Sequence, residues 1–155
     1  IVTVDRYGDG KCGNCGWYQD ETRKSSPDFV MYPNLISLNK AKLLYSQNKP
    51  LKPDFNDFIK ALFMYSEVSF YYKGKGYGAY YYAKDSNNLS YTNSDGLVEF
   101  FEDGKPNSLV KFKSLEDFKN NANINGQKLK DIWDEVTNAD YMSWTIQLKI
   151  RQSHN

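Results

Sequence analysis

Residues 68–82 read VSFYYKGKGYGAYYY, and this stretch decides the fold of the chain. Aromatic and β-branched residues favour strands, because they pack well on a pleated and half-buried surface. Two runs of such residues flank the KGKG segment at residues 73–76, where glycine tolerates the positive φ angles of a tight turn. The stretch therefore predicts two antiparallel strands joined by a short hairpin turn.

The region that follows continues this pattern. Ten of the chain's 25 aromatic residues lie between Phe70 and Phe101. A turn-like NSDG segment at residues 93–96 precedes another aromatic and aliphatic run at residues 97–101. An Asp-Gly turn comes before residues 108–112, which have the composition of a last strand. We therefore expect an antiparallel meander of three or four strands.

Two helices are predicted before the meander. Ser37 is a suitable N-cap for a helix over about residues 38–47, because its hydroxyl can accept a hydrogen bond from a free backbone N–H. Asp54 can cap a second helix in the same way. The apolar residues of this second helix recur at the spacing of one helical face; they are Phe55, Phe58, Ile59, Leu62 and Phe63.

Two further helices are predicted after the meander. Ser114 and Asp117 have the spacing of a capping box, which predicts a short helix over residues 115–121. The Asn-Gly pair at residues 125–126 is expected to end it. A second helix is predicted over residues 127–136, with one buried stripe; the stripe consists of Leu129, Ile132, Trp133 and Val136.

The C-terminal segment alternates between apolar and polar residues over residues 142–150, which is typical of a half-buried strand. We expect this long strand to return to the meander sheet. A chain of 155 residues is predicted to form a single α+β domain, with amphipathic helices packed on the sheet. Its expected segments are a loop-rich part (1–35), two helices (36–66), the meander (67–113), two helices (114–137) and the strand (141–151).

Charge and composition exclude several classes of protein. The chain has 20 lysine and arginine residues against 19 acidic residues, whereas a general nucleic-acid binder carries a clear basic excess. No apolar run approaches the ~20 residues that span a bilayer, so we expect a cytoplasmic protein without a membrane partner. The charges are uneven: residues 1–94 carry 12 bases and 9 acids, and residues 95–140 carry 6 bases and 10 acids.

Cys12 and Cys15 form the one motif with intrinsic chemistry. Two thiolates at this spacing supply half of a tetrahedral zinc site. The chain has no other cysteine, and its single histidine, His154, lies next to the C-terminus. We therefore interpret the motif as a turn with two thiols and no metal, and keep zinc as the minor alternative. No cofactor is predicted, and the sequence does not define the oligomeric state.

Acidic residues of the second half are the candidate binding residues. On the predicted helix 127–136 the acids fall opposite the apolar stripe, so they form either a solvated face or a face that binds a partner; they are Asp131, Asp134 and Glu135. The same two interpretations apply to a second set, which consists of Asp95, Glu99, Glu102 and Asp103. An enzyme is disfavoured, because no serine or cysteine nucleophile has a suitable histidine; a hydrolase that uses carboxylates alone is the weakest alternative.

Two segments near the N-terminus resemble a known family. Residues 12–20 read CGNCGWYQD and residues 33–45 read PNLISLNKAKLLY. Together they resemble the second half of the cysteine-rich CPCC family, which carries Cys-x-x-Cys-Gly-Trp and then Pro-Asn-x-x-Ser-Leu-x-x-Ala. The resemblance covers roughly the first 45 residues. The family's leading Cys-Pro-Cys-Cys element is missing here, so a four-cysteine zinc site does not carry over.

A weaker resemblance concerns the second half of the chain. The segments FKSLEDF at residues 112–118 and INGQKLKDIW at residues 124–133 are similar to parts of small bacterial immunity proteins. Both resemblances imply an immunity protein of the contact-dependent growth-inhibition kind. Such a protein binds the C-terminal toxin domain of its cognate partner, with a nuclease as the candidate toxin, and neutralises it by occlusion.

Tyr80 and Tyr82 fit this function as apolar anchors beside the acidic residues, since tyrosine is enriched at the energetic centres of interfaces. The alternative function is a small nucleic-acid-associated domain with a vestigial zinc knuckle. In that case the same two tyrosines would stack on bases and lysines would hold phosphates. The near-neutral charge of the chain disfavours this alternative.

The cysteine motif yields the first testable prediction. We expect the purified protein to bind no stoichiometric zinc, and to fold when Cys12 and Cys15 are both replaced by serine, because a second pair of ligands is missing. Elemental analysis and circular dichroism measure the two quantities. One zinc per chain, together with loss of fold in the double variant, would contradict this prediction.

Overall fold

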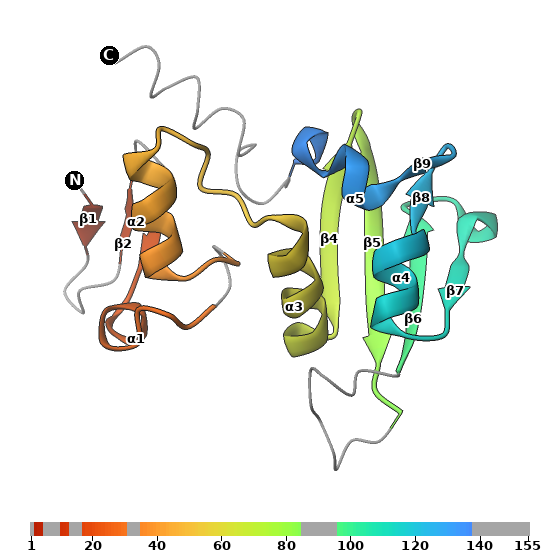
Figure 1. Ribbon diagram of the computed structural model, residues 1–155, viewed down its shortest axis with the longest axis horizontal. Coiled ribbons are helices and arrows are strands. Elements are labelled where there is room, and N and C mark those ends of the chain that lie inside the picture. Colours follow the sequence, from red (N-terminus) through yellow and green to blue (C-terminus); the bar gives the residue numbers. More distant parts are fainter. Residues whose placement is uncertain (1, 5–9, 13–16, 31–34, 85–95, 138–155) are drawn as a thin grey trace. The chain divides into compact units, whose positions relative to one another are not determined.

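The computed structural model describes residues 2–4, 10–12, 17–30, 35–84 and 96–137 (Figure 1). Backbone contacts divide the chain into two compact units, each of which is described by itself. The first unit comprises Ile1–Pro53 with Asn138–Asn155, and the second comprises Asp54–Thr137. A single domain of 155 residues stays a prediction. No helix within the described ranges is long and apolar enough to cross a bilayer.

The described residues of the first unit form a small antiparallel sheet and two helices. The strands β1 (Val2–Val4), β2 (Gly10–Cys12) and β3 (Tyr18–Gln19) lie in the order β1-β2-β3. The helices are α1 (Glu21–Ser25) and α2 (Leu38–Ser46). The Ser37 hydroxyl accepts a hydrogen bond from the Lys40 backbone N–H at 3.1 Å, which confirms the predicted cap. The helix ends one residue before its predicted end.

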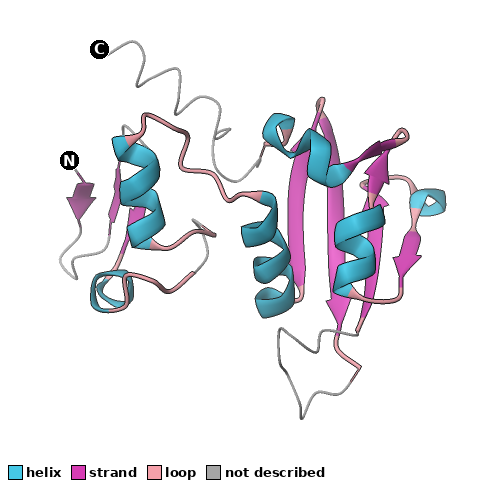
Figure 2. Ribbon diagram, viewed as in Figure 1, coloured by secondary structure: helices cyan, strands magenta, loops and turns pink. Residues whose placement is uncertain are grey.

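The second unit is an α+β structure built on a four-stranded antiparallel meander, as predicted (Figure 2). Its strands lie in the order β4-β5-β6-β7. They are β4 (Glu67–Tyr72), β5 (Lys75–Tyr82), β6 (Leu97–Glu102) and β7 (Val110–Phe112). The remaining elements are α3 (Phe55–Tyr65), the 3₁₀ helix η2 (Pro106–Ser108), α4 (Leu115–Asn121), β8 (Asn123–Ile124), β9 (Gln127–Lys128), α5 (Leu129–Ile132) and the 3₁₀ helix η3 (Trp133–Glu135).

A two-residue turn joins β4 to β5. Lys73 and Gly74 have φ angles of 49° and 76°, and both values are positive, as a type I′ turn requires. Tyr72 and Lys75 therefore face each other as the last pair of the hairpin. The turn is shorter than the predicted one, because Lys75 and Gly76 already belong to β5.

Helix α3 begins as its sequence predicts. The Asp54 carboxylate accepts a hydrogen bond from the Asp57 backbone N–H at 2.8 Å, and the Asp57 carboxylate accepts one from the Asp54 N–H at 3.0 Å. This reciprocal capping box satisfies two N–H groups that the helix itself leaves free. The helix ends at Tyr65, and its C-cap residue Ser66, with a φ of 63°, turns the chain toward β4.

Helices α3 and α4 cover one face of the meander (Figure 1). Phe58 of α3 is 1% exposed and lies at the centre of the aromatic core. Its ring centroid is 5.7 Å from that of Phe70, 6.2 Å from that of Phe118 and 4.6 Å from that of Trp133. One side chain thus connects a strand with three helical elements.

The segment after α4 differs from the sequence prediction. Residues 127–136 were expected to form one helix, and instead they form β9, α5 and η3. The reason is the Asn-Gly pair: Asn125 and Gly126 have φ angles of 53° and 82°, so they form a second turn of the I′ kind between β8 and β9. The predicted stripe of this segment is nevertheless buried.

The ends of the meander also differ from the expectation. Residue 108 was predicted to begin the last strand, but Pro106–Ser108 form η2, so β7 begins at Val110. At the other edge, Thr137 pairs with Tyr71 of β4 in an antiparallel bridge, through N–O distances of 2.7 and 2.8 Å. The predicted strand 141–151 lies outside the described residues.

Phe58 provides a test of this core. Phe58→Ala should lower the free energy of unfolding by about 3–5 kcal/mol, because it removes a fully buried aromatic side chain. Met64→Ala on the same helix is the matched control; Met64 is 43% exposed, and its loss should cost less than about 0.5 kcal/mol. Chemical denaturation measures both values. Equal effects of the two substitutions would contradict the central position of Phe58.

Candidate protein-binding surface

The meander has a second face that α3 and α4 do not cover. Successive side chains of a strand point to opposite faces, and in β4 the buried positions alternate strictly with exposed ones. Buried Phe70 packs on Phe58 of α3, so its neighbours Ser69 and Tyr71 point away from the helices. We call this the outer face. Its residues are Glu67, Ser69, Tyr71, Gly76, Gly78, Tyr80, Tyr82, Leu97, Glu99, Phe101 and Lys111.

Strand register places four residues of the outer face in one row. Glu67 pairs with Tyr80, Tyr80 pairs with Glu99, and Glu99 pairs with Lys111. The Lys111 Nζ lies 3.5 Å from Glu99 Oε1, and the Tyr82 hydroxyl donates to Glu99 Oε2 at 3.3 Å. The row therefore places Tyr80 between two carboxylates, with Lys111 at the end of the row next to Glu99.

Tyr80 of this row also forms an aromatic pair with Phe101. The ring centroids of Tyr80 and Phe101 are 5.3 Å apart, and the ring planes differ by 21°, so the rings are stacked. Phe101 leans over Gly78, its partner on β5: a Cβ at that position would lie 2.5 Å from Phe101 Cζ. Only glycine leaves room for the ring there. The pair thus forms one continuous apolar surface from β5 to β6.

Tyr80 and Tyr82 stay protonated at neutral pH. The Glu67 carboxylate, which also hydrogen-bonds the Tyr80 hydroxyl, raises the pKa of Tyr80. Partial desolvation raises the pKa of Tyr82, and the nearby Glu99 carboxylate adds to the effect. Both hydroxyls are therefore donors to carboxylates over the physiological range.

Several predicted site residues meet on this surface. Tyr80, Tyr82 and Glu99 share the outer face, and Asp103 joins them because its carboxylate lies over Gly76. Sequence reasoning missed two of their neighbours, Glu67 and Phe101. The sequence spacing could have identified them, because residues separated by an even number of positions on a strand lie on the same face of the sheet. Phe101 lies two residues after Glu99, and Glu67 lies four residues before Tyr71.

Glu102 does not belong to this group. It pairs with Tyr77, whose side chain is buried on the helix-covered face. Its carboxylate lies 2.7 Å from the Nζ of Lys105 and 3.6 Å from that of Lys75. Glu102 therefore links the first residue of β5 to the turn that follows β6, and points away from the outer face.

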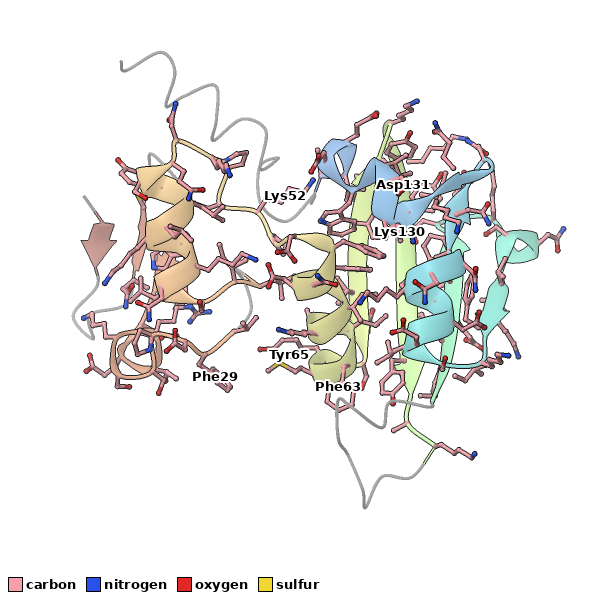
Figure 3. The ribbon with its side chains drawn as sticks, viewed as in Figure 1. Phe29, Lys52, Phe63, Tyr65, Lys130 and Asp131 are labelled. Carbon is pink, nitrogen blue, oxygen red and sulfur yellow. The ribbon has the colours of Figure 1, made fainter. Side chains whose placement is uncertain are left out.

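The acids of the C-terminal segment lie elsewhere in the second unit. Asp131, Asp134 and Glu135 are exposed, as predicted, although they belong to α5 and η3 rather than to one helix. Figure 3 labels Asp131 on α5. Neighbouring Trp133 packs on Phe70, which places this segment on the helix-covered side of the sheet.

Lysines also moderate the charge of this segment. Lys128 and Lys130 lie in the same segment as the three acids, and the Glu135 carboxylate interacts with Lys73. The pKa of Lys73 is raised mainly by its hydrogen bond with Tyr72, and the negative charge of Glu135 raises it further. Asp95, the remaining predicted residue, lies outside the described residues.

The first unit gives Cys12 a packing role. Cys12 is 8% exposed in a core with Trp17, Ile36, Ala41 and Leu51, and its backbone N–H donates to the Trp17 carbonyl at 2.8 Å. Serine at this position would place a hydroxyl in that core. Cys15 lies outside the described residues. Among those that are described, no three His, Cys, Asp or Glu side chains gather as a metal site would require.

Arg23 is a buried charged residue that sequence reasoning did not identify. It is 2% exposed, its guanidinium forms an ion pair with the Asp20 carboxylate, and it lies 5.0 Å from the ring centroid of Tyr18. Asp20 also caps α1, accepting a hydrogen bond from the Arg23 backbone N–H at 2.8 Å. These contacts satisfy the charge within the first unit, so we assign Arg23 a structural role.

Comparison with known proteins gives no match among protein-family models, curated proteins or solved structures. The resemblances to the CPCC family and to bacterial immunity proteins therefore stay predictions from sequence.

The role of Glu102 can be tested by pH. Its hydrogen bond with Lys105 holds the pKa of Glu102 below the ordinary value. A depressed pKa stabilises the fold above the unfolded-state pKa, and this stabilisation is lost as the pH falls through the folded-state pKa. The stability difference between the native protein and Glu102→Gln should therefore shrink between pH 6 and pH 3.

Denaturation at both pH values measures this difference. Glu116→Gln, at an exposed position of α4, is the control substitution. A difference for Glu102→Gln that is the same at both pH values would show that the ion pair does not stabilise the fold.

Proposed function

We propose that this chain is a non-catalytic immunity protein that binds the C-terminal domain of a cognate bacterial toxin and blocks it by occlusion. The observation that carries this proposal is the outer face, where stacked Tyr80 and Phe101 lie among carboxylates. Aromatic side chains with a polar surround are typical anchors of protein interfaces.

The charge of the outer face supports a basic partner. Its described charged groups are Glu67, Glu99 and Lys111, and Asp103 adds a third acid from the adjoining turn. A toxin that cleaves RNA or DNA holds phosphates in a basic cleft. Complementary potentials speed encounter with such a cleft and disfavour other partners. We therefore propose a nuclease as the toxin.

The outer face is also well prepared for binding. Its side chains stand on a four-stranded sheet that is backed by the aromatic core around Phe58. Glu67 and Glu99 already have hydrogen bonds from the tyrosines beside them. A surface that needs little ordering loses less conformational entropy when a partner binds.

The same carboxylates disfavour the alternative of a nucleic-acid-associated domain. Tyr80 has a glutamate on each neighbouring strand, and Tyr82 donates to Glu99. A base stacked on these rings would bring its phosphate close to two negative charges. We propose that the protein acts in the cytoplasm of the toxin's target cell, where a nuclease toxin meets nucleic acid.

Growth rescue tests the function directly. The toxin domain should be encoded at the end of the gene immediately upstream, and its expression should arrest growth unless this protein is co-expressed. We expect the two to co-purify as a stable complex. An upstream gene without such a domain, or a toxin that this protein does not neutralise, would reject the proposal.

Charge reversal tests the surface. Glu67→Lys with Glu99→Lys should slow association with the toxin domain by about ten-fold and reduce the salt dependence of the rate, because electrostatic steering is lost. Glu116→Lys on α4 is the matched control and should leave the rate nearly unchanged. A triple variant of Asp131, Asp134 and Glu135 to lysine tests the other acidic segment.

Binding kinetics at two salt concentrations distinguish these outcomes. If only the triple variant associates slowly, then the C-terminal segment binds the toxin and the outer face does not. If neither variant differs from the control, both acidic surfaces are rejected as the binding site.

A further inference from the structure

The Tyr80–Phe101 pair offers a planar group a surface on which to stack. Both rings are partly exposed on the outer face and nearly parallel. The tip of the Phe101 ring lies over Gly78, where no Cβ obstructs it. Cations are attracted to such ring faces, and a planar cation also gains stacking contacts.

Carboxylates flank this pair on two sides. Glu67 is the direct neighbour of Tyr80 on β4, and Glu99 is its direct neighbour on β6. Adjacent strands are about 4.8 Å apart, so the two backbone positions are separated by about 10 Å, with the tyrosine between them. A cation above Tyr80 would be attracted by both carboxylates at once.

Lys111 partly occupies this site in the free protein. Its ammonium lies 3.5 Å from Glu99 Oε1, and its side chain is 60% exposed. Exposed lysine–glutamate pairs of this length contribute little, because water competes for both groups. Lys111 can therefore be displaced from Glu99 by a cation that makes better hydrogen bonds.

Arginine fits these features better than lysine does. Its guanidinium is planar, stacks on aromatic rings and carries five N–H donors in a fixed fork, which suits two carboxylates on different sides. An ammonium group has the same charge but can neither stack nor bind in a bidentate manner.

We propose that the outer face binds an arginine side chain of the partner protein, with the guanidinium on the Tyr80–Phe101 pair and its N–H groups on Glu67 and Glu99. The identity of that partner as a toxin rests on the proposed function. The arginine site itself is a property of this chain and can be tested without the toxin.

A peptide titration followed by NMR is the test. The ¹⁵N-labelled full chain is titrated with a hexa-arginine peptide, and with hexa-lysine as a probe of equal charge. We expect saturable shifts of the Glu67, Tyr80, Glu99 and Phe101 amides, with hexa-arginine binding about three-fold or more tightly than hexa-lysine. Shifts centred elsewhere, or equal binding of the two peptides, would overturn the proposal.

Three variants separate stacking from charge. Phe101→Leu should weaken hexa-arginine binding by about three-fold and hexa-lysine binding by less, because both cations lose attraction to the ring and only the guanidinium also loses stacking contacts. Glu67→Gln with Glu99→Gln should weaken both peptides, whereas Lys111→Ala should strengthen hexa-arginine binding by freeing Glu99. Amide spectra report whether each variant is folded. A Lys111→Ala variant with weaker binding, or equal losses for both peptides in Phe101→Leu, would contradict the assignment.

The same variants distinguish this proposal from the proposed function. Full toxin neutralisation by Phe101→Leu and by the double glutamine variant would overturn the arginine site and leave the immunity function standing. Arginine-selective peptide binding without any toxin neutralisation would support the site and reject the function.

Discussion

The alternation of side chains along β4, β5 and β6 is the constraint on which the second unit depends. Each strand sends every second residue toward the helices, and the aromatic members of that set meet around Phe58. The other set is left on the outer face. Because the period is two, a shift of register by one residue would exchange the core and the surface. The two-residue turn between β4 and β5, with positive φ angles at Lys73 and Gly74, restricts such a shift between these two strands.

This constraint explains which parts of the fold were predictable. Helices α2, α3 and α4 begin with local capping signals, and a cap involves only residues within one turn of each other, so the sequence is sufficient to place them. The meander was predictable from aromatic runs and turn residues. The segment after α4 was not, because the helical spacing of its apolar residues competed with the hairpin preference of Asn125-Gly126, and the hairpin prevailed.

The candidate surface was less accessible to prediction, because it depends on contacts between strands. Glu99 and Glu102 are three residues apart and look like one acidic cluster in the sequence. Because an odd number of positions separates them on one strand, their side chains point to opposite faces of the sheet. Only Glu99 lies beside Tyr80 and Tyr82. The pairing of Tyr80 with Glu67 requires the register of β4 against β5, which depends on the length of the turn between them.

The two edges of the meander bear on the behaviour of the protein at high concentration. An edge strand offers unpaired N–H and C=O groups to other chains, and sheets can grow into aggregates through such edges. At one edge, Thr137 pairs with the middle of β4 and interrupts this template. At the other, β7 is only three residues long and carries Lys111, a charge that opposes docking of another copy. Both features disfavour the growth of aggregates through the edges of this aromatic-rich sheet.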